Sequence, residues 1–308
     1  MGRYIFQRVG YALVTFFLVA TFSFYLMQTL PGSPFNDDKL SAAQKERLYE
    51  KYGLDEPIST QYIKYMTNIF KGDLGVSFQF DGRPVTTIIA ERIGPSAQLG
   101  IQALIVGTIL GIIVGIIAAM RHNTILDYGA MLLSVLGIAV PSFVFAGFLQ
   151  FWIGVKLQWL PVAMWNGFEY TIMPTITLAV SIVAVIARYM RTEMLEVLSQ
   201  DYMMTAEAKG LSSWAIVTRH SIRNAIIPVI TILGPLVVSL ITGSLIIENI
   251  FGIPGLGEQF VQSILTNDYP IIMGTTLLYS ALFIGVTLLV DVLYGIIDPR
   301  IRLMGEGK

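Results

Sequence analysis

Few side chains in this sequence could carry out covalent chemistry, and their spacing matches no common catalytic site. The chain contains two histidines, His122 and His220, and no cysteine. Without cysteine it can form no disulfide, iron–sulfur cluster or thiolate nucleophile. Neither histidine lies in an HExxH sequence, and no GxxxxGK(S/T) phosphate-binding sequence is present. We therefore expect no catalytic residue, no metal site and no cofactor bound by this chain.

The charged residues in or next to the apolar segments lie near the ends of those segments. They are Asp127, Arg188, Glu248 and Asp291. A charge near the middle of a bilayer is costly and usually marks an ion or proton pathway. Their position therefore argues against a proton- or sodium-coupled transporter. The net charge of -1 also provides no basic excess for binding nucleic acid.

The composition indicates that these polar groups are positioned by membrane-spanning helices. Of the residues, 54% are hydrophobic and 13% are charged, whereas soluble proteins have about 25% charged residues. The mean hydropathy is +0.67. A helix needs about 20 apolar residues to cross a hydrocarbon core of about 30 Å. Six segments meet this requirement: residues 9–30, 97–120, 130–155, 172–189, 226–247 and 271–297. We predict an all-α integral membrane protein with six transmembrane helices in one domain, residues 1–308.

The distribution of basic residues predicts the orientation of these helices. Lys and Arg in short loops gather on the cytoplasmic side of a membrane. With the N-terminus inside, the short outer loops contain only Lys156. The inner segments then contain Arg3, Arg8, Arg121, Arg188, Arg191, Lys209, Arg219, Arg223, Arg300, Arg302 and Lys308. We therefore predict cytoplasmic termini, an extracytoplasmic segment at residues 31–96 and a cytoplasmic loop at residues 191–225.

The outer segment contains the start and stop signals of two short helices. Ser41 and Gln44 form a capping-box pattern, and Gly53 is suited to end the helix that follows. Pro57 suits the first position of a second helix. The apolar residues of that helix recur on one face: Ile58, Tyr62, Tyr65, Met66 and Ile69. This face could pack on the transmembrane bundle, or it could contact a delivered ligand or an external partner.

Three glycines in the second apolar segment recur every four residues. Gly107, Gly111 and Gly115 therefore share one helix face and allow a neighbouring backbone to approach closely. We predict that this face packs against another helix within or between subunits. The alternative is that the small residues line a translocation pathway.

Two prolines interrupt apolar segments. Pro141 lies in the third segment and Pro235 in the fifth. Proline removes a backbone hydrogen bond and tends to bend a helix. Both positions could be bending points in helices that line a pathway and rearrange, or they could be static kinks stabilised by neighbouring helices.

The loop at residues 191–225 is the one sizeable polar segment predicted on the inner side. Its composition favours a helix up to Lys209, which Gly210 can end in the left-handed conformation. Ser212 or Ser213 could cap a second helix that runs through Asn224. The small residues Ala206 and Gly210 would let the loop fit closely into a groove of another protein, whereas its basic residues alone could reflect the inside-positive bias.

Several motifs in this chain resemble those of peptide and nickel ABC transporter permeases, in the same order from the first span to the C-terminus. Two lie in or beside the inner loop: Asp201-Tyr-x-x-Thr-Ala-x-Ala-Lys-Gly-Leu211 and Arg219-His-x-x-Arg-Asn-Ala-x-x-Pro228. The others are Pro31-Gly-x-Pro34, Gly72-Asp-Leu-Gly-x-Ser77, Ala139-Val-Pro-Ser-Phe143, Glu248-Asn-x-Phe-x-Ile-Pro-Gly-Leu-Gly257, Asp268-Tyr-Pro270 and Asp291-x-Leu-Tyr-x-x-x-Asp-Pro-Arg300. Each motif is weak alone, but the ordered set resembles the B-type subunit of oligopeptide permeases.

The resemblance implies a type I importer fold and one half of a translocation pathway for peptides in the cell membrane of a prokaryote. It implies a second homologous permease subunit, two cytoplasmic subunits that bind ATP and Mg²⁺, and an extracytoplasmic peptide-binding protein. The positions that match the docking loop are Asp201, Tyr202, Thr205, Ala206, Glu207, Ala208, Lys209, Gly210, Leu211, Arg219 and Arg223. In the wider importer class a proline stands where this chain has Arg223, and the next proline here is Pro228, which fits the peptide branch.

Candidate pathway positions follow from these motifs and from the place of each residue in its span. Pro141 and Ser142 lie in the motif at residues 139–143, and Pro235 lies near the middle of the fifth span. Glu248 begins a possible outer rim of the pathway that extends to Gly257. The cargo stays open between oligopeptides, dipeptides, a nickel chelate and another small solute. Free nickel is disfavoured because His and Cys ligands are nearly absent. Rival functions are an ion-coupled secondary transporter, an intramembrane enzyme and a receptor that binds ligand without moving it.

Overall fold

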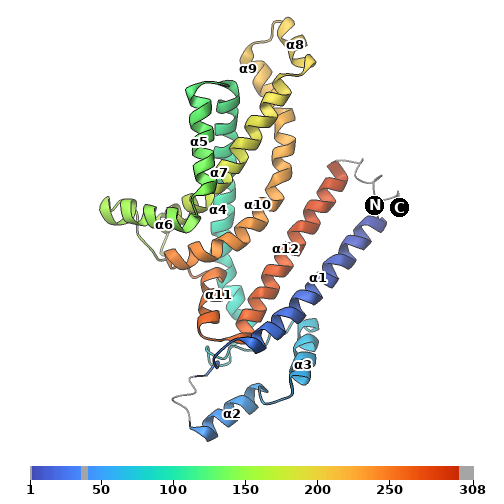
Figure 1. Ribbon diagram of the computed structural model, residues 1–308, viewed down its shortest axis with the longest axis vertical. Coiled ribbons are helices and arrows are strands. Elements are labelled where there is room, and N and C mark those ends of the chain that lie inside the picture. Colours follow the sequence, from blue (N-terminus) through green and yellow to red (C-terminus); the bar gives the residue numbers. More distant parts are fainter. Residues whose placement is uncertain (1, 36–40, 298–308) are drawn as a thin grey trace. The chain divides into compact units, whose positions relative to one another are not determined.

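The computed structural model describes residues 2–35 and 41–297, and it is helical almost throughout (Figure 1). The elements in chain order are α1 Gly2–Thr29, α2 Ala42–Tyr52, α3 Ile58–Phe70, α4 Val85–Met120, α5 Ile125–Ala139, α6 Ser142–Leu149, η2 Gln150–Lys156, α7 Glu169–Leu198, α8 Asp201–Ala208, α9 Ser213–Ile216, η3 Val217–Ser221, α10 Ile222–Phe251, α11 Leu256–Leu265 and α12 Tyr269–Ile297. Within these residues, the sole β-type pairing is an isolated bridge between Val76 and Pro84. The all-α prediction is confirmed.

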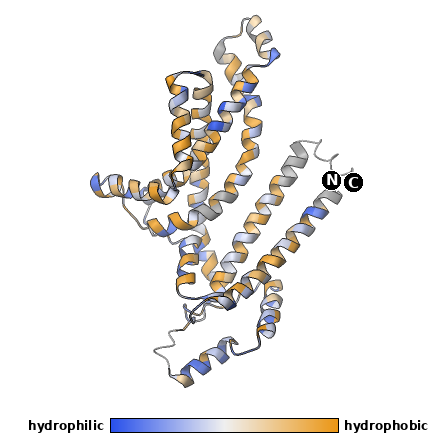
Figure 2. Cartoon of the chain, viewed as in Figure 1, coloured by the Kyte–Doolittle hydropathy of each residue, from blue (hydrophilic) through white to orange (hydrophobic). Residues whose placement is uncertain are grey.

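The long helices carry the apolar surface expected of membrane spans. Four stretches are long and apolar enough to cross a bilayer: Phe6–Thr29, Val85–Met120, Glu169–Leu198 and Tyr269–Val290. Predicted segments 1, 2, 4 and 6 fall largely within them. In α10, the apolar stretch among the described residues is shorter, Ile222–Val237. Hydrophobic residues run along the long helices, whereas α2 is largely hydrophilic (Figure 2).

The predicted span at residues 130–155 is broken near its middle. The axis of α5 makes an angle of 103° with that of α6 and η2 together. Val140 is extended, as the residue before a proline usually is, and Pro141 becomes the N-cap of α6 with φ -57° and ψ 138°. Proline has no N–H to continue the ladder of α5, so the chain restarts as a new helix. The break is sharper than the bend expected from Pro141.

The chain contains two compact units, which are described separately. The first comprises Met1–Gly94 and Pro254–Lys308, and the second comprises Pro95–Ile253. α4 begins in the first unit and continues into the second, with Pro95 inside it.

In the first unit, α1 and α12 lie side by side (Figure 1). Arg8 and Tyr11 of α1 line a small cavity together with Thr287 and Leu288 of α12. Because the start of α1 meets the later part of α12, the two helices are antiparallel. A small apolar core of Val85, Ile88, Ile89, Leu256 and Ile271 joins the first turns of α4 to α11 and α12.

The two short helices predicted in the outer segment are present. The Ser41 and Gln44 capping box starts α2, and Gly53 ends it with φ +67°. Pro57 is the N-cap of α3 rather than its first residue, so that prediction was wrong by one position. Tyr62 donates or accepts a 2.8 Å hydrogen bond with Thr21 of α1, and its ring packs against that of Phe24. The apolar face of α3 therefore packs on the first transmembrane helix.

In the second unit, α7 lies at the centre of the core. It packs against α5, α6 and α10. Its buried side chains include Met173, Ile182, Ile186, Met190 and Met194. Since α7 also leads directly into the inner loop, this core holds the helix from which the candidate site extends.

Candidate functional site

The inner loop forms a helix, a tight turn and a second helix at the end of α7. Residues 199–200 link α7 to α8, the amide of Lys209 donates to the carbonyl of Thr205 at 3.1 Å, and Gly210 follows with φ +76°. This left-handed conformation costs little in glycine and is strained in most other residues. The predicted helix and its glycine stop are both present, and the helix ends at Ala208, one residue earlier than expected.

The second helix of the loop begins as predicted but does not end at Asn224. Ser212 caps it, because its Oγ accepts from the amide of Ala215 at 3.3 Å. The chain then passes through α9 and the wider turns of η3 directly into α10. No helix-stopping residue stands at Asn224, so the helix continues into the membrane.

Two contacts attach α8 to the neighbouring helices. Met203 is 4% exposed and packs with Ile216, against the partly buried Val197 and Leu198. The side-chain amide of Asn224 donates to the hydroxyl of Tyr202 at 3.0 Å. These contacts connect the loop helix to the start of α10 and the end of α7. Sequence reasoning missed Met203 and Ile216, although the adjacent methionines Met203 and Met204 in the loop helix were a visible signal.

The remaining surface of α8 and its turn faces away from the rest of the second unit. The residues exposed there include Asp201, Thr205, Ala208, Lys209, Gly210 and Leu211. A Cβ atom placed on Gly210 would meet nothing within 4 Å. Arg223 is exposed too, whereas the side chains of Ala206, Glu207 and Arg219 lie outside the described residues. The loop thus presents small, polar and apolar groups, including Met204 at 62% exposed, on a helix that the described residues leave uncovered.

α4 and α7 meet along a contact that we call the glycine seam: Gly107, Gly111 and Gly115 of α4 against Ile182, Ile186 and Met190 of α7. A Cβ on Gly107 would lie 2.6 Å from Cβ of Ile182. On Gly115 it would lie 2.7 Å from the carbonyl oxygen of Ala187. The three glycines therefore lie against a helix of the same chain, where any side chain would overlap with α7.

A buried ion pair joins the start of α5 to α7. Asp127 is fully buried, and Arg191 donates to its two carboxylate oxygens at 2.5 and 2.7 Å. The amide of Asn123 donates to Asp127 at 3.0 Å, and His122 lies 3.2 Å from the same carboxylate. Both charges were recognised in the sequence, but their pairing was not, since 64 residues separate them. The pair places the turn after α4 beside the end of α7 that leads into the loop.

The candidate pathway residues lie on α6 and α10. Pro141 and Ser142 stand at the break between α5 and α6, and Pro235 is exposed inside α10, whose axis changes direction along its length (Figure 1). Glu248 is fully buried near the end of α10. The side-chain amide of Gln150 donates to the carbonyl of Ile250 at 3.1 Å and so links η2 to this end of α10.

In the first unit, one buried carboxylate organises the loop that leads into α4. Asp268 accepts from the hydroxyl of Ser77 and from the amides of Phe78 and Gln79, each amide at 3.2 Å. We call these four residues the aspartate clamp. Gln79 also donates to the carbonyl of Thr266 at 3.0 Å. The motifs containing Ser77 and Asp268 are thus joined in space, although about 190 residues separate them in sequence.

None of these sites has the make-up of a catalytic centre. Among residues 2–35 and 41–297, no group of three or more His, Cys, Asp or Glu residues is placed to hold a metal ion. The second unit instead combines a helix core, a broken span and an exposed loop helix that is attached to the end of α7 and the start of α10.

Two family descriptions together match nearly the whole chain. Residues 1–99 match the N-terminal part of the membrane component of binding-protein-dependent transport systems. Residues 111–303 match the inner membrane component of the same systems. The chain belongs to this permease family. It is therefore a multi-pass transport subunit and not an enzyme, and the ATPase activity of such importers lies in separate subunits.

Relatives of this permease match it from end to end. It is 46% identical to the dipeptide transport system permease protein DppB of Lactococcus lactis subsp. cremoris, covering 98% of this chain and 100% of that one. It is 44% identical to DppB of Bacillus subtilis, with both chains fully covered. It is 43% identical to the oligopeptide transport system permease protein OppB of Haemophilus influenzae, covering 98% and 100%.

A solved structure supports the fold of the permease. The structure titled "Crystal structure of an amino acid ABC transporter with histidines" aligns with a TM-score of 0.51 and covers 70% of this chain and 94% of that one. At 16% identity the likeness shows the fold alone. The fold is that of a type I importer permease, as the sequence motifs implied.

Proposed function

We propose that this permease forms half of the translocation pathway of an ATP-driven, binding-protein-dependent importer of peptides. The observation that carries the proposal is the end-to-end match to permeases named for dipeptide and oligopeptide transport, at 40–46% identity. Few charges lie within its spans, which suits a wide, hydrated conduit better than a tight ion site.

Oligopeptides are the proposed cargo, with dipeptides as the alternative. Relatives at 46% and 44% identity carry the dipeptide name, and one at 43% carries the oligopeptide name. Competition for uptake by peptides of two to six residues would separate the two. Inhibition that is strongest with peptides of four residues or more supports the oligopeptide cargo; inhibition by dipeptides alone supports the alternative.

In the proposed orientation both termini and the inner loop are cytoplasmic, and residues 31–96 are extracytoplasmic. The ion pair between Asp127 and Arg191 supports this orientation, because it places the turn bearing Arg121 at the same end of the second unit as α8. Basic residues from two loops then gather on one side of that unit, as expected of a cytoplasmic face.

The exposed surface of α8 and its turn is the proposed contact with a cytoplasmic ATPase subunit. Two such subunits would bind ATP and Mg²⁺, and their closure would move α8. Since Met203 and Tyr202 attach α8 to α7 and α10, the movement would reach both transmembrane helices. A second, homologous permease subunit would complete the pathway, and an extracytoplasmic peptide-binding protein would deliver the cargo.

Reconstitution into lipid vesicles tests this function. We expect labelled peptide to accumulate only when ATP, both partner types and the binding protein are present. Accumulation driven by a proton or sodium gradient without the ATPase subunits would contradict the proposal and support a secondary transporter. Peptide binding without accumulation would support a receptor.

A further inference from the structure

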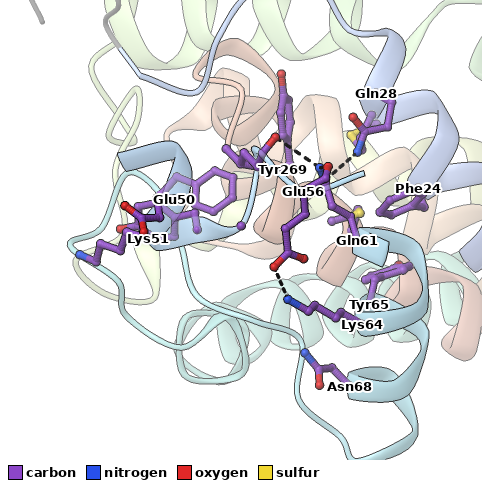
Figure 3. A pocket seen from close by; sticks show the side chains of 16 residues that line it. Phe24, Gln28, Glu50, Lys51, Glu56, Gln61, Lys64, Tyr65, Asn68 and Tyr269 are labelled. Atoms are coloured by element: carbon purple, nitrogen blue, oxygen red, sulfur yellow. Dashed lines mark hydrogen bonds and ion pairs between the residues drawn. The ribbon is translucent and has the colours of Figure 1, made fainter. Parts of the chain in front are cut away.

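The first unit contains a cavity of about 380 Å³ that the pathway described above does not use. It lies between the end of α1, the end of α2, one face of α3 and the start of α12 (Figure 3). Its volume falls within the range of small-molecule sites, about 300–1,000 Å³. Its lining combines charged groups, amides and aromatic rings, so it is neither purely apolar nor purely polar.

Two polar atoms of this cavity are buried and lack a hydrogen-bond partner. They are Oε2 of Glu56 and the hydroxyl of Tyr65. Buried polar atoms are nearly always hydrogen-bonded, because an unmet donor or acceptor costs about 1–3 kcal/mol. Burial also raises the pKa of Tyr65, so its hydroxyl stays protonated at neutral pH. The cavity thus offers a carboxylate oxygen that can only accept and a hydroxyl that can accept or donate.

The position of Glu56 is fixed before any ligand arrives. The side-chain amide of Gln61 donates to the carbonyl of Glu56 at 2.8 Å and to that of Leu54 at 3.3 Å. Gln61 in turn accepts from Gln28 of α1 at 3.2 Å. The other carboxylate oxygen of Glu56 forms an ion pair with Lys64. Figure 3 shows these side chains gathered around the cavity. A preorganised group of this kind loses little entropy on binding.

Aromatic rings line the same cavity. Phe24 and Tyr65 are stacked, with ring centroids 5.5 Å apart. Tyr52 and Phe78 lie 4.7 Å apart. The faces of aromatic rings attract cations as well as apolar groups. Together with the free acceptor on Glu56, they favour a ligand that carries a positive charge next to an apolar group.

We infer that this cavity binds a primary ammonium group, whose N–H groups donate hydrogen bonds to Glu56 and Tyr65. We further infer that this ammonium is the N-terminus of a short peptide. The peptide as source rests on the proposed function, whereas the ammonium chemistry rests on the cavity alone. Lys64 competes with the ligand for the same carboxylate, so it sets a limit on the affinity of the site.

Saturation-transfer NMR on the assembled importer, in nanodiscs of phosphatidylglycerol without its peptide-binding protein, tests this site. The probes are trialanine and N-acetyl-trialanine. We expect the free peptide to bind at least tenfold more tightly than the acetylated one. Glu56→Gln should weaken trialanine binding about tenfold, which corresponds to about 1.4 kcal/mol, and Tyr65→Phe about threefold.

Lys64→Met provides a prediction of opposite sign, since it should strengthen trialanine binding by freeing the carboxylate. A merely structural role for Glu56 and Lys64 would make both variants lose binding and melt at lower temperature. Glu46→Gln on the exposed face of α2 is the matched control and should change nothing. Equal binding of the two probes, or unchanged binding in Glu56→Gln, would overturn the ammonium site.

Phosphatidylethanolamine added to the nanodiscs distinguishes the source. Displacement of trialanine by this lipid would keep the ammonium site but overturn the peptide as its occupant. ATP-driven peptide uptake, measured in parallel, separates this inference from the proposed function. Wild-type uptake without trialanine binding would contradict the site alone, and absence of uptake with all partners present would contradict the function.

Discussion

At the glycine seam, α4 and α7 lie so close that a Cβ on Gly115 would be 2.7 Å from a backbone oxygen. At the aspartate clamp, by contrast, one buried carboxylate holds a loop through a hydroxyl and two amides. Within a bilayer there is little hydrophobic gain from joining two helices, so close packing of small residues has to provide the contact. Outside it, irregular backbone needs hydrogen-bond partners, and a buried carboxylate can supply several. The two regions should therefore fail in different ways.

The largest effect is expected where a charge is buried between the start of α5 and the seam helix α7. Asp127→Asn leaves Arg191 without its counter-ion and should lower the stability of the second unit by about 3–5 kcal/mol. Thermal unfolding in nanodiscs measures this loss. The double variant Asp127→Asn with Arg191→Met should recover part of it, and a double variant no better than the single one would show that the pair contributes little.

Gly115→Ala tests the seam itself. The added Cβ must displace either Met190 or the backbone of α7, which should cost about 1–3 kcal/mol. Gly100→Ala on the same helix is the control, because a Cβ there meets nothing within 4 Å. Equal melting temperatures for the two variants would contradict the close packing of α4 on α7.

Asp268→Asn tests the clamp and should act locally. Losing the carboxylate weakens three hydrogen bonds, at a cost of about 1–2 kcal/mol. Hydrogen exchange should rise at residues 77–80, while the amides of α7 stay protected. Asp55→Asn, at an exposed position of the segment at residues 31–96 that also contains Ser77, provides the comparison. Faster exchange spread evenly over both units would erase the distinction between the two regions.

Ser41→Ala should have the smallest effect. It removes the capping box of α2, an exposed helix with no buried residue, and should cost about 1 kcal/mol. Exchange should increase in the first turn of α2 only. A loss of peptide uptake in this variant would instead show that α2 is part of the transport machinery.

The comparison also explains what the sequence could predict. The seam was visible because its glycines recur with the period of a helix, and the capping box was visible because its two residues are three apart. The clamp and the Asp127–Arg191 pair were not, since the partners lie 189–191 and 64 residues apart and no local pattern joins them. At Pro141 the sequence indicated a bend, but whether a proline kinks a helix or ends it depends on tertiary packing.

The inner loop falls between these cases. Gly210 was predicted because a helical composition ends at it, and its left-handed conformation follows from that local rule. The attachment of α8 through Met203 and Ile216 requires two helices to be brought together, so it was not predicted.

ATP-driven peptide uptake by two variants at Gly210 tests the central claim most directly. Asn tolerates the left-handed conformation, whereas Val does not. If α8 docks closely on an ATPase subunit, both Gly210→Asn and Gly210→Val should lose uptake while the permease still inserts in the membrane. Normal uptake by Gly210→Asn would show that the glycine serves only the turn, and would contradict close docking.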